Sequence, residues 1–589
     1  MFNTKSMMTV FCLTVVFAAA GMGGELKDDW SDFLHYTKIG RVDLAVSFGR
    51  AILNSQPDPA DLVDLAVANP RGYEVVCKIN QKQANAELAS VTEQIIALVD
   101  QGRYVKRKDP RLVVEEVKRL NTTERGRLAA IKRLKDSGEF SIPFLLDVLA
   151  DPTRSSEFAN VIWALPQIGQ PAIRPLGVAI QSPNPQVRSE VIAALGNISY
   201  PQGLAYLKYI VENDSSTQMK DMAMASINKI DPSVMGVSAA ELFFQLAEKY
   251  YYHHDSLSPT SKNGMSNVWF WDEESQRLVW QEVDSRYFNE LMAMRSCEWA
   301  LKADSGYGKA VGLWLASYFK AEAVGEPMPA YFGEGHANAY VYGTSAGPAY
   351  LHQALARGLD ENNAAVALAA TEALIVTAGE QSIFAGGIEQ PMLKALTFND
   401  PAVRTSASIA VAMAGPRGTL TEGLAVVQNL ATAISAGIAA TASPEEQIYA
   451  LRSLKALLAA GQQRNSALDL DNALEATVRA AASSDLDIRM SAVQVLGYMN
   501  SPLAQKAIAT VALDENLGLE SRITAFESLT TSGKLSNNML VDGVLQQIYD
   551  VISDESADAD LRSAASTAFG ALNLPSENVM SLILDQAKS

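Results

Sequence analysis

Hydrophobic positions along this chain repeat with the spacing of an α-helix, and the same local pattern recurs several times. In each copy an apolar residue precedes an arginine, and small or apolar residues follow 4, 8 and 11 positions after that apolar residue. Steps of three and four residues place side chains on one face of a helix. The four sets are Val187/Val191/Leu195/Ile198, Val403/Ala407/Val411/Ala414, Ile488/Ala492/Leu496/Met499 and Leu561/Ala565/Phe569/Leu572. Because a single helix of this kind cannot bury its apolar face alone, we expect consecutive units to stack.

Glycine and proline residues predict where these helices end and how they are paired. Gly196, Gly497 and Gly570 stand eight residues after the arginine, where a helix is expected to stop. Turns such as Asp151-Pro152 separate each helix from an earlier apolar helix. The pattern predicts helical pairs over residues 122–230 and again over 350–589.

The repeated order is a helix, an Asp-Pro-type turn, an apolar residue with arginine, a helix rich in small residues, and a glycine. It resembles the HEAT repeat family over roughly two-thirds of the chain. The resemblance implies an all-α fold, an α-solenoid of HEAT-like helical hairpins, whose concave surface binds other macromolecules. It also implies a ladder in which the arginines after the turns bond acidic groups of a neighbouring unit. The residues in that place are Arg188, Arg404, Arg489, Arg522 and Arg562, although Arg522 follows Ser521 and lacks the later glycine.

The first residues have the features of an export signal. Lys5 supplies a positive charge, Met7 to Ala20 is a short and mostly apolar run, and small residues precede Gly21. We expect residues 1–20 to be a signal peptide and the protein to be exported, periplasmic or extracellular. No other segment is long and apolar enough to span a bilayer, so stable membrane insertion is not expected.

Residues 21–121 are predicted to form an N-terminal helical region. Within Trp30 to Leu53, an aromatic helix, Gly40 and a second helix follow one another in an order that resembles one tetratricopeptide unit. A long polar helix near Lys82 to Asp100 leads into a basic stretch.

An aromatic-rich insert, residues 231–349, interrupts the repeats. Two β-rich runs, 267–271 and 277–283, are separated by a polar loop and predict a β-hairpin. A helical pair, Tyr287 to Ala303 and Gly308 to Val324, is expected next. We expect the remainder, Gly325 to Gly347, to be a loop.

Three tryptophans give the hairpin a possible binding role. Trp269 and Trp271 fall on one face of the first strand, and Trp280 lies on the second. If exposed, these rings would form a platform for a protein partner. If buried, they would fix the hairpin to the solenoid.

Charge narrows the range of partners. The formal net charge of −18 disfavours general nucleic-acid binding and adhesion to anionic lipid. Residues 102–135 depart from this balance, with twelve Lys or Arg against four Asp or Glu. Two interpretations stay open: a solvated helix face, which the i,i+4 pair Glu115 and Arg119 favours, or a docking patch for an acidic partner.

One motif matches the spacing of a catalytic nucleophile. Gly343, Ser345 and Gly347 have the Gly-x-Ser-x-Gly arrangement, which requires a preceding buried strand and a downstream catalytic histidine. His352 is the only histidine that follows, and no parallel sheet is predicted. We therefore interpret the motif as a loop that enters the next helix.

Metal and thiol chemistry have little support. His253 and His254 are adjacent, and further ligands such as Glu334 or His336 stand at no signature spacing. Beyond the export signal only Cys77 and Cys297 remain, and their spacing does not tell whether they pair. No metal site, cofactor or catalytic residue is predicted.

The leading hypothesis is a non-catalytic exported scaffold that mediates protein-protein interaction through its superhelical surface. The alternative is an enzyme-associated protein with a ligand or metal site in the insert, around His253, His254, Glu334 and His336. HEAT-like repeats also resemble bilin lyases, which handle tetrapyrroles, and that resemblance motivates the alternative.

Overall fold

The computed structural model of the chain describes residues 19–82, 85–258, 264–384, 390–575 and 580. It divides into two compact units, Met1–Met292 and Ala293–Ser589. Among the described residues the fold is helical apart from one two-stranded antiparallel sheet, which confirms the predicted α-solenoid with a hairpin insert. The expected signal peptide lies almost entirely outside the described residues, and the five-part division of the chain stays a prediction. No helix within the described ranges combines the length and apolarity that crossing a bilayer requires.

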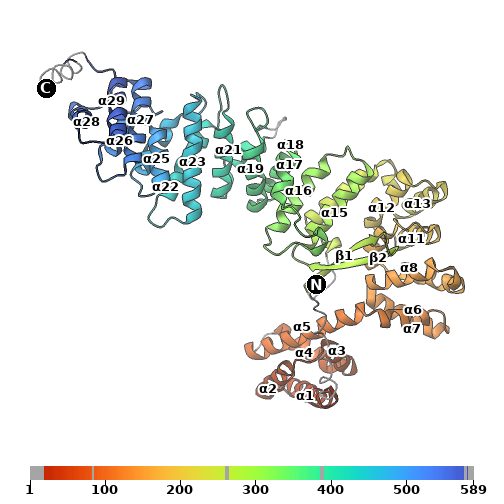
Figure 1. Cartoon of the computed structure of the whole chain (residues 1–589). Helices are drawn as coiled ribbons and strands as arrows, with labels where there is room; N and C mark the ends of the chain where they lie inside the picture. Colours follow the sequence, from red (N-terminus) through yellow and green to blue (C-terminus); the bar gives the residue numbers. More distant parts are fainter. Residues whose placement is uncertain (1–18, 83–84, 259–263, 385–389, 576–579, 581–589) are drawn as a thin grey trace, which may run out of the picture. The chain divides into compact units, whose positions relative to one another are not determined.

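The first unit begins with a small bundle of helices packed along one long helix (Figure 1). Gly40, with φ of +75°, separates the first two helices and confirms the predicted helix pair. The bundle core contains Phe33, Ile52 and Ile95, all fully buried. Its helices are α1 (Ala19–Ile39), α2 (Val42–Asn54), α3 (Pro59–Ala68), α4 (Pro70–Lys82) and α5 (Ala86–Lys108).

Paired helices with short 3₁₀ turns between them fill the rest of the first unit. The helix that begins at Phe158 stops at Ala164 and continues as a 3₁₀ turn to Ile168, because Pro166 has no N–H to donate to an α-helix. The helices are α6 (Pro110–Arg119), α7 (Glu124–Ser137), α8 (Ile142–Ala150), α9 (Phe158–Ala164), α10 (Ile173–Ala179), α11 (Pro185–Ile198), α12 (Leu204–Asn213), α13 (Thr217–Ile230) and α14 (Ala239–Tyr251). The 3₁₀ turns are η1 (Gly138–Ser141), η2 (Pro152–Glu157), η3 (Leu165–Ile168), η4 (Gln170–Ala172), η5 (Pro201–Gly203), η6 (Pro232–Gly236) and η7 (Asp255–Leu257).

The predicted hairpin is present as β1 (Met265–Asp272) and β2 (Arg277–Asp284). The strands pair with Trp269 opposite Trp280, so these two side chains share one face of the hairpin. Helix α15 (Phe288–Ala303) follows and contains the boundary between the two units.

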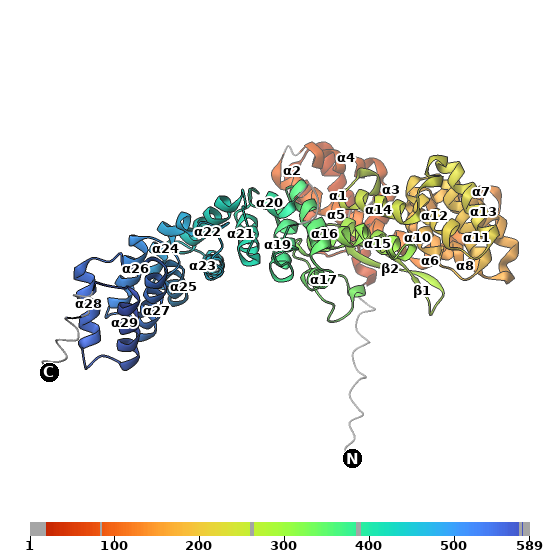
Figure 2. The same cartoon turned by 90° about the horizontal axis from the view of Figure 1, so that it is seen from above.

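Stacked helix pairs make up most of the second unit. The second helices of successive pairs pack on one another, α19 on α21 and so on to α27 on α29, in a row that Figure 2 shows from above. The helices are α16 (Lys309–Glu322), α17 (Ala339–Ala346), α18 (Pro348–Asp360), α19 (Ala364–Thr377), α20 (Pro391–Ala395), α21 (Pro401–Ala414), α22 (Gly423–Gly437), α23 (Pro444–Gln462), α24 (Leu474–Ala481), α25 (Leu486–Leu496), α26 (Pro502–Leu513), α27 (Leu519–Ser536), α28 (Asp542–Ser553) and α29 (Ala559–Ala571). Short 3₁₀ turns, η8 (Ala330–Phe332) and η9 (Leu470–Ala473), lie between them.

The arginines after the turns do not form the expected ladder of acidic partners. Within the described part of the chain only Arg188 has a carboxylate partner, with its Nε 3.6 Å from Asp214 Oδ2. The other four donate to backbone carbonyl groups in the last turn of the preceding helix (Ala512 and Ile552) or two to three residues beyond its end (Ser483 and Phe398). Carbonyl groups in the last turn of a helix lack partners within it, and this end of the helix dipole is negative, so a guanidinium group is a suitable donor there. The bonds join Arg404 Nη1 to Phe398 O (2.6 Å), Arg489 Nη1 to Ser483 O (2.8 Å), Arg522 Nε to Ala512 O (3.1 Å) and Arg562 Nε to Ile552 O (3.2 Å).

Candidate functional site

The aromatic face of the hairpin is turned toward the helices of the first unit. Trp269 is 2% exposed, and its ring centroid lies 5.3 Å from that of Trp280 and 6.4 Å from that of Phe140. Trp271 and Trp280 are half-buried. Trp269 therefore fixes the hairpin to the helices. A partner-binding role for the three tryptophans stays a prediction, for which only Trp271 and Trp280 have exposed surface.

A buried carboxylate organises the contact between the hairpin and the helices. Glu139, 6% exposed, follows the end of α7, where Gly138 has a φ of +59° that favours glycine. Its two oxygens accept hydrogen bonds from Asn267 Nδ2 (2.7 Å) and Trp269 Nε1 (2.8 Å). Arg174 Nη2 on α10 lies 3.8 Å from the same carboxylate. A buried charge is tolerated when it is paired and hydrogen-bonded in this way.

The end of α5 extends this polar network to the hairpin. The Tyr104 hydroxyl donates to Asn267 Oδ1 at 3.1 Å, and burial raises the pKa of the Tyr104 phenol, which keeps it a donor. Four residues further on, Lys108 forms an ion pair with Glu282 of β2. Helix α5 and the hairpin are thus joined by two adjacent polar contacts.

A second ion pair holds the other end of β2. Arg277 Nε and Nη2 donate to the two oxygens of Asp147 on α8, at 3.0 and 2.8 Å. Burial raises the pKa of Asp147, and the Arg277 charge opposes that rise. With contacts to α5, η1, α8 and α10, the hairpin is part of the rigid framework of the first unit.

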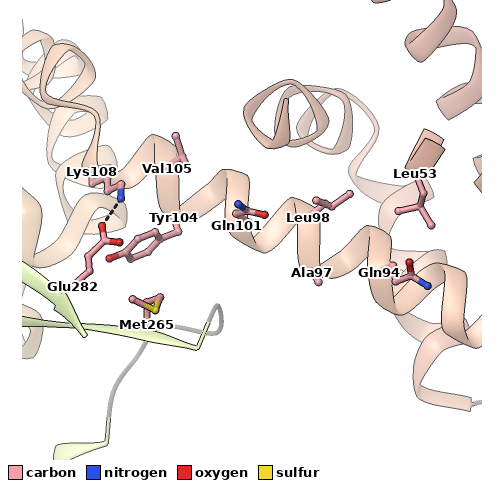
Figure 3. A pocket seen from close by; sticks show the side chains of 10 residues that line it. All are labelled: Leu53, Gln94, Ala97, Leu98, Gln101, Tyr104, Val105, Lys108, Met265 and Glu282. Carbon is pink, nitrogen blue, oxygen red and sulfur yellow. Dashed lines mark hydrogen bonds and ion pairs between the residues drawn. The ribbon is translucent and has the colours of Figure 1, made fainter. Parts of the chain in front are cut away.

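Between α5, the end of α2 and the hairpin lies an open groove of about 720 Å³, which we call the α5 groove (Figure 3). Its α5 residues recur every three or four positions and therefore share one face of the helix. Figure 3 shows them in a row that leads from Leu53 to the Lys108–Glu282 ion pair. The lining residues are Leu53, Gln94, Ala97, Leu98, Gln101, Tyr104, Val105, Lys108, Met265 and Glu282.

The α5 groove is electrically neutral and mixed in character. Lys108 and Glu282 are its only charged residues, and they neutralise each other. The Lys108 ammonium also lies 4.9 Å from the centroid of the Tyr104 ring. Gln94 and Gln101 supply amides that both donate and accept hydrogen bonds. Such a lining suits a ligand with apolar groups and neutral polar groups.

The Gly-x-Ser-x-Gly motif lies on a helix, which corrects the expected loop. Asn338 caps α17 by accepting a hydrogen bond from the Val341 amide (3.0 Å), and this cap starts a helix in the predicted loop. Ser345 Oγ donates to Val341 O at 2.8 Å, an ordinary bond within a helix. His352 is buried and its Nε2 contacts Ser382 O at 2.9 Å. These contacts give Ser345 no activating base.

The three histidines of the insert contact three different groups and do not converge on one site. His253 Nε2 contacts Glu290, His254 Nδ1 contacts Ser256 Oγ at 2.8 Å, and His336 Nδ1 contacts Gly333 O at 3.1 Å. In the described ranges, no three His, Cys, Asp or Glu side chains gather as metal ligands would. Cys77 and Cys297 are not joined by a disulfide bond.

Sequence reasoning missed the residues that build this site. Glu139 stands alone after a glycine with no spacing that marks it, and its partners are 128 and 130 positions away. A weak signal was available for the groove. Gln94, Gln101 and Lys108 recur every seven residues, which indicates one continuous helix face; the helix was predicted to end near Asp100, whereas α5 continues to Lys108.

A family model of HEAT repeats matches residues 142–228, which include α8 to α12 and most of α13. No curated protein matches the chain. Among solved structures, an engineered protein is 16% identical, with 78% of this chain and 99% of that chain covered and a TM-score of 0.25. Human deoxyhypusine hydroxylase is 11% identical, with 81% and 99% covered and a TM-score of 0.19. A mutant of Kap121p is 11% identical, with 93% and 54% covered and a TM-score of 0.31. TM-scores this low carry no information on partners or activity.

Proposed function

We propose that this chain, a HEAT-repeat protein, is a non-catalytic exported scaffold that binds another protein, and that the α5 groove is its binding site. The observation that carries the proposal is the lining of the groove. One continuous helix face offers aliphatic and amide side chains, next to a hairpin held rigidly by the Glu139 network. Export is proposed from the apolar, positively flanked N-terminal segment alone.

The dimensions of the α5 groove fit an extended peptide segment. From Gln94 to Lys108 the helix rises about 21 Å, at 1.5 Å per residue. An extended peptide covers that length with about six residues, at 3.3 Å each. Its alternate apolar side chains would pack on Leu98 and Val105, and its backbone would bond the amides of Gln94 and Gln101.

The charge of the groove favours a peptide over a nucleic acid as its ligand. A phosphate backbone requires several cations whose charge is available, whereas the one lysine here is already paired with Glu282. The formal net charge of −18 adds a general repulsion. A neutral peptide segment meets neither obstacle.

Selection from a random peptide display library tests the proposal. The wild-type chain is expected to enrich peptides with two apolar positions, which then bind the purified protein with a Kd in the micromolar range. Ala97→Trp fills the groove from an exposed position and is expected to weaken binding at least tenfold. Ala559→Trp, at an exposed position of α29, is the matched control and should bind like the wild type.

Circular dichroism and the unfolding midpoint should be the same for the wild type and both variants, since each substitution lies on the surface. If the library yields no enriched peptide, or if Ala97→Trp binds the enriched peptides as tightly as the wild type, the α5 groove is not a peptide site.

A further inference from the structure

Part of the basic stretch forms an exposed surface that the α5 groove does not include, and we call it the α7 patch. On α7, cations and one leucine recur every three or four residues and therefore form a single row along the helix. On α9, which contacts α7 through Arg127, two large apolar side chains are exposed. The patch consists of Arg125, Leu128, Lys132 and Lys135 on α7 and Ile162 and Trp163 on α9.

Arg127 of α7 joins the two helices. The guanidinium carbon of Arg127 lies 5.5 Å from the centroid of the Trp163 ring, and Arg127 Nη1 donates to Asn160 Oδ1 at 2.9 Å. These contacts hold the Trp163 ring in place while it stays 41% exposed, and Leu128 nearby on α7 is 56% exposed. Large apolar groups held in fixed positions at a surface are typical of interaction sites.

The cations of the patch differ from most of the other basic residues of the stretch, of which only Arg107, Lys118 and Arg127 also lack an ion pair within the described residues. Six of the twelve are in ion pairs, and a seventh, Arg127, stacks on Trp163. Within the described residues, Arg125, Lys132 and Lys135 form no ion pair, although they are close in sequence and on one helix face. The paired residues are Arg103, Lys106, Lys108, Arg111, Arg119 and Arg133.

We propose that the α7 patch docks an acidic peptide segment of a partner protein. Carboxylates of the segment pair with Arg125, Lys132 and Lys135, and an apolar side chain between them packs on Leu128 and Trp163. Charge complementarity supports this occupant, because three cations without ion-pair partners surround exposed apolar groups in a chain that is otherwise strongly acidic. The proposal extends beyond the α5 groove, with which the patch shares no residue.

An acidic peptide fits the patch better than an anionic membrane does. A bilayer is a wide negative surface, and it would meet the formal net charge of −18 as well as the few cations of the patch. Charges further apart than about 8 Å are screened at physiological salt, so a short peptide meets the patch alone.

Fluorescence anisotropy tests the proposal with a labelled peptide of about twelve residues that repeats Glu-Glu-Leu-Phe. The wild type is expected to bind it saturably, and the affinity should fall at least tenfold between about 50 and about 300 mM salt. The double variant Arg125→Glu with Lys132→Glu is expected to lose at least tenfold in affinity. Trp163→Ser is expected to lose about threefold to tenfold, since it removes apolar contact only.

Matched control variants show whether a loss of affinity is specific to the α7 patch. Lys455→Glu with Lys506→Glu reverses two exposed cations on α23 and α26 and should leave the affinity unchanged. Ala97→Trp should also bind this peptide like the wild type, so the α7 patch and the α5 groove can fail separately.

Four results would overturn the proposal. The first is equal binding of a peptide in which each Glu is replaced by Gln. The second is equal loss of affinity in the Lys455/Lys506 control. The third is binding to vesicles rich in phosphatidylserine without binding to the peptide. The fourth is a dimer that Arg125→Glu with Lys132→Glu dissociates, because the patch would then join two copies of this chain.

Discussion

The hairpin of the first unit and the helix pairs of the second unit are held by contacts of different range along the chain. Glu139 bonds Asn267 and Trp269 across 128 and 130 residues, through side chains alone. Arg404 bonds the Phe398 carbonyl across six residues, with the backbone as acceptor. The helix pairs are therefore fixed largely by local sequence, whereas the hairpin depends on a few distant side chains.

This difference has consequences for stability. Helix pairs that contact mainly their neighbours unfold and refold in small steps, and damage to one pair is partly contained. Three side chains of the hairpin network contact the buried Glu139 carboxylate, so the loss of this carboxylate leaves several buried polar groups without a partner at once. The predictions below test this contrast, beginning with the largest expected effect.

Removal of the Glu139 carboxylate should release the hairpin. Glu139→Ala leaves Asn267 Nδ2, Trp269 Nε1 and Arg174 without their acceptor in a buried site. Breaking a buried charged network of this kind costs about 3 to 5 kcal/mol. Hydrogen-deuterium exchange should show the amides of β1 and β2 losing protection, while those of α18 to α29 keep theirs.

The matched variant Glu139→Gln retains one acceptor oxygen and should lose less protection than Glu139→Ala. Tryptophan fluorescence provides a second measurement, because Trp269 and Trp280 gain access to water when the hairpin is released. If β1 and β2 stay protected in Glu139→Ala, the hairpin is held by its apolar contacts and the contrast between the two regions is lost.

The sequence separation between contacting residues also explains which parts of the structure could be predicted from the sequence. The helix over Ile488 to Met499 was predicted from local periodicity, and it is present as α25, which ends at Leu496, three residues before Met499. In the structure, the capping box that Ser443 and Glu446 form at the start of α23 spans only four residues. Helix pairs are recoverable because their periodicity, caps and turns all lie in short windows of sequence.

Contacts that depend on folding could not be predicted in this way. The arginine partners were wrong in four of five cases, because the acceptors are carbonyl groups that every residue carries and no sequence pattern marks. The burial of Trp269 follows from Glu139 and Phe140, which are far away in the sequence. Helix α17 was missed because the glycines at 343 and 347 favoured a loop, while its cap, Asn338, carried the opposite signal.

The second prediction concerns one arginine of the helix pairs. Arg404→Ala removes hydrogen bonds to the Phe398 and Asn399 carbonyl groups, at 2.6 and 2.8 Å. Hydrogen bonds from a charged group contribute about 1.5 to 3 kcal/mol, so the free energy of unfolding of this pair should fall by that amount. Exchange of the α20 and α21 amides is the appropriate measurement.

Two further variants make this test specific. Arg404→Lys keeps the charge with fewer donors and should recover part of the loss. Arg417→Ala removes an arginine side chain that is 86% exposed and pairs with Glu380, and it should change the free energy of unfolding by less than about 1 kcal/mol. If Arg404→Ala also exposes amides far from α20 and α21, the helix pairs are not independent.

The smallest expected effect concerns His352, a buried ionisable group among the helix pairs. Burial lowers the pKa of His352, and its hydrogen bond to the Ser382 carbonyl opposes that shift in part. Since a carbonyl only accepts, Nε2 carries the proton of the neutral ring, and protonation would add an N–H at Nδ1. That nitrogen is buried without a partner in the described structure. The folded state therefore favours the neutral ring.

The direction of the pH dependence follows from this lowered pKa. The unfolded chain binds a proton at the ordinary value of about 6.5, whereas the folded chain binds it only at lower pH. The contribution of the neutral His352 ring to stability is therefore complete above the unfolded-state pKa. It declines as the pH falls from that pKa toward the lower pKa of the folded state. Thermal unfolding midpoints between about pH 7.5 and about pH 5 should fall more steeply for the wild type than for His352→Gln, whose amide nitrogen can still donate to Ser382. Parallel slopes would show that the His352 ring protonates without cost, and His352 would then not resemble Glu139 in the dependence of folding on its charge.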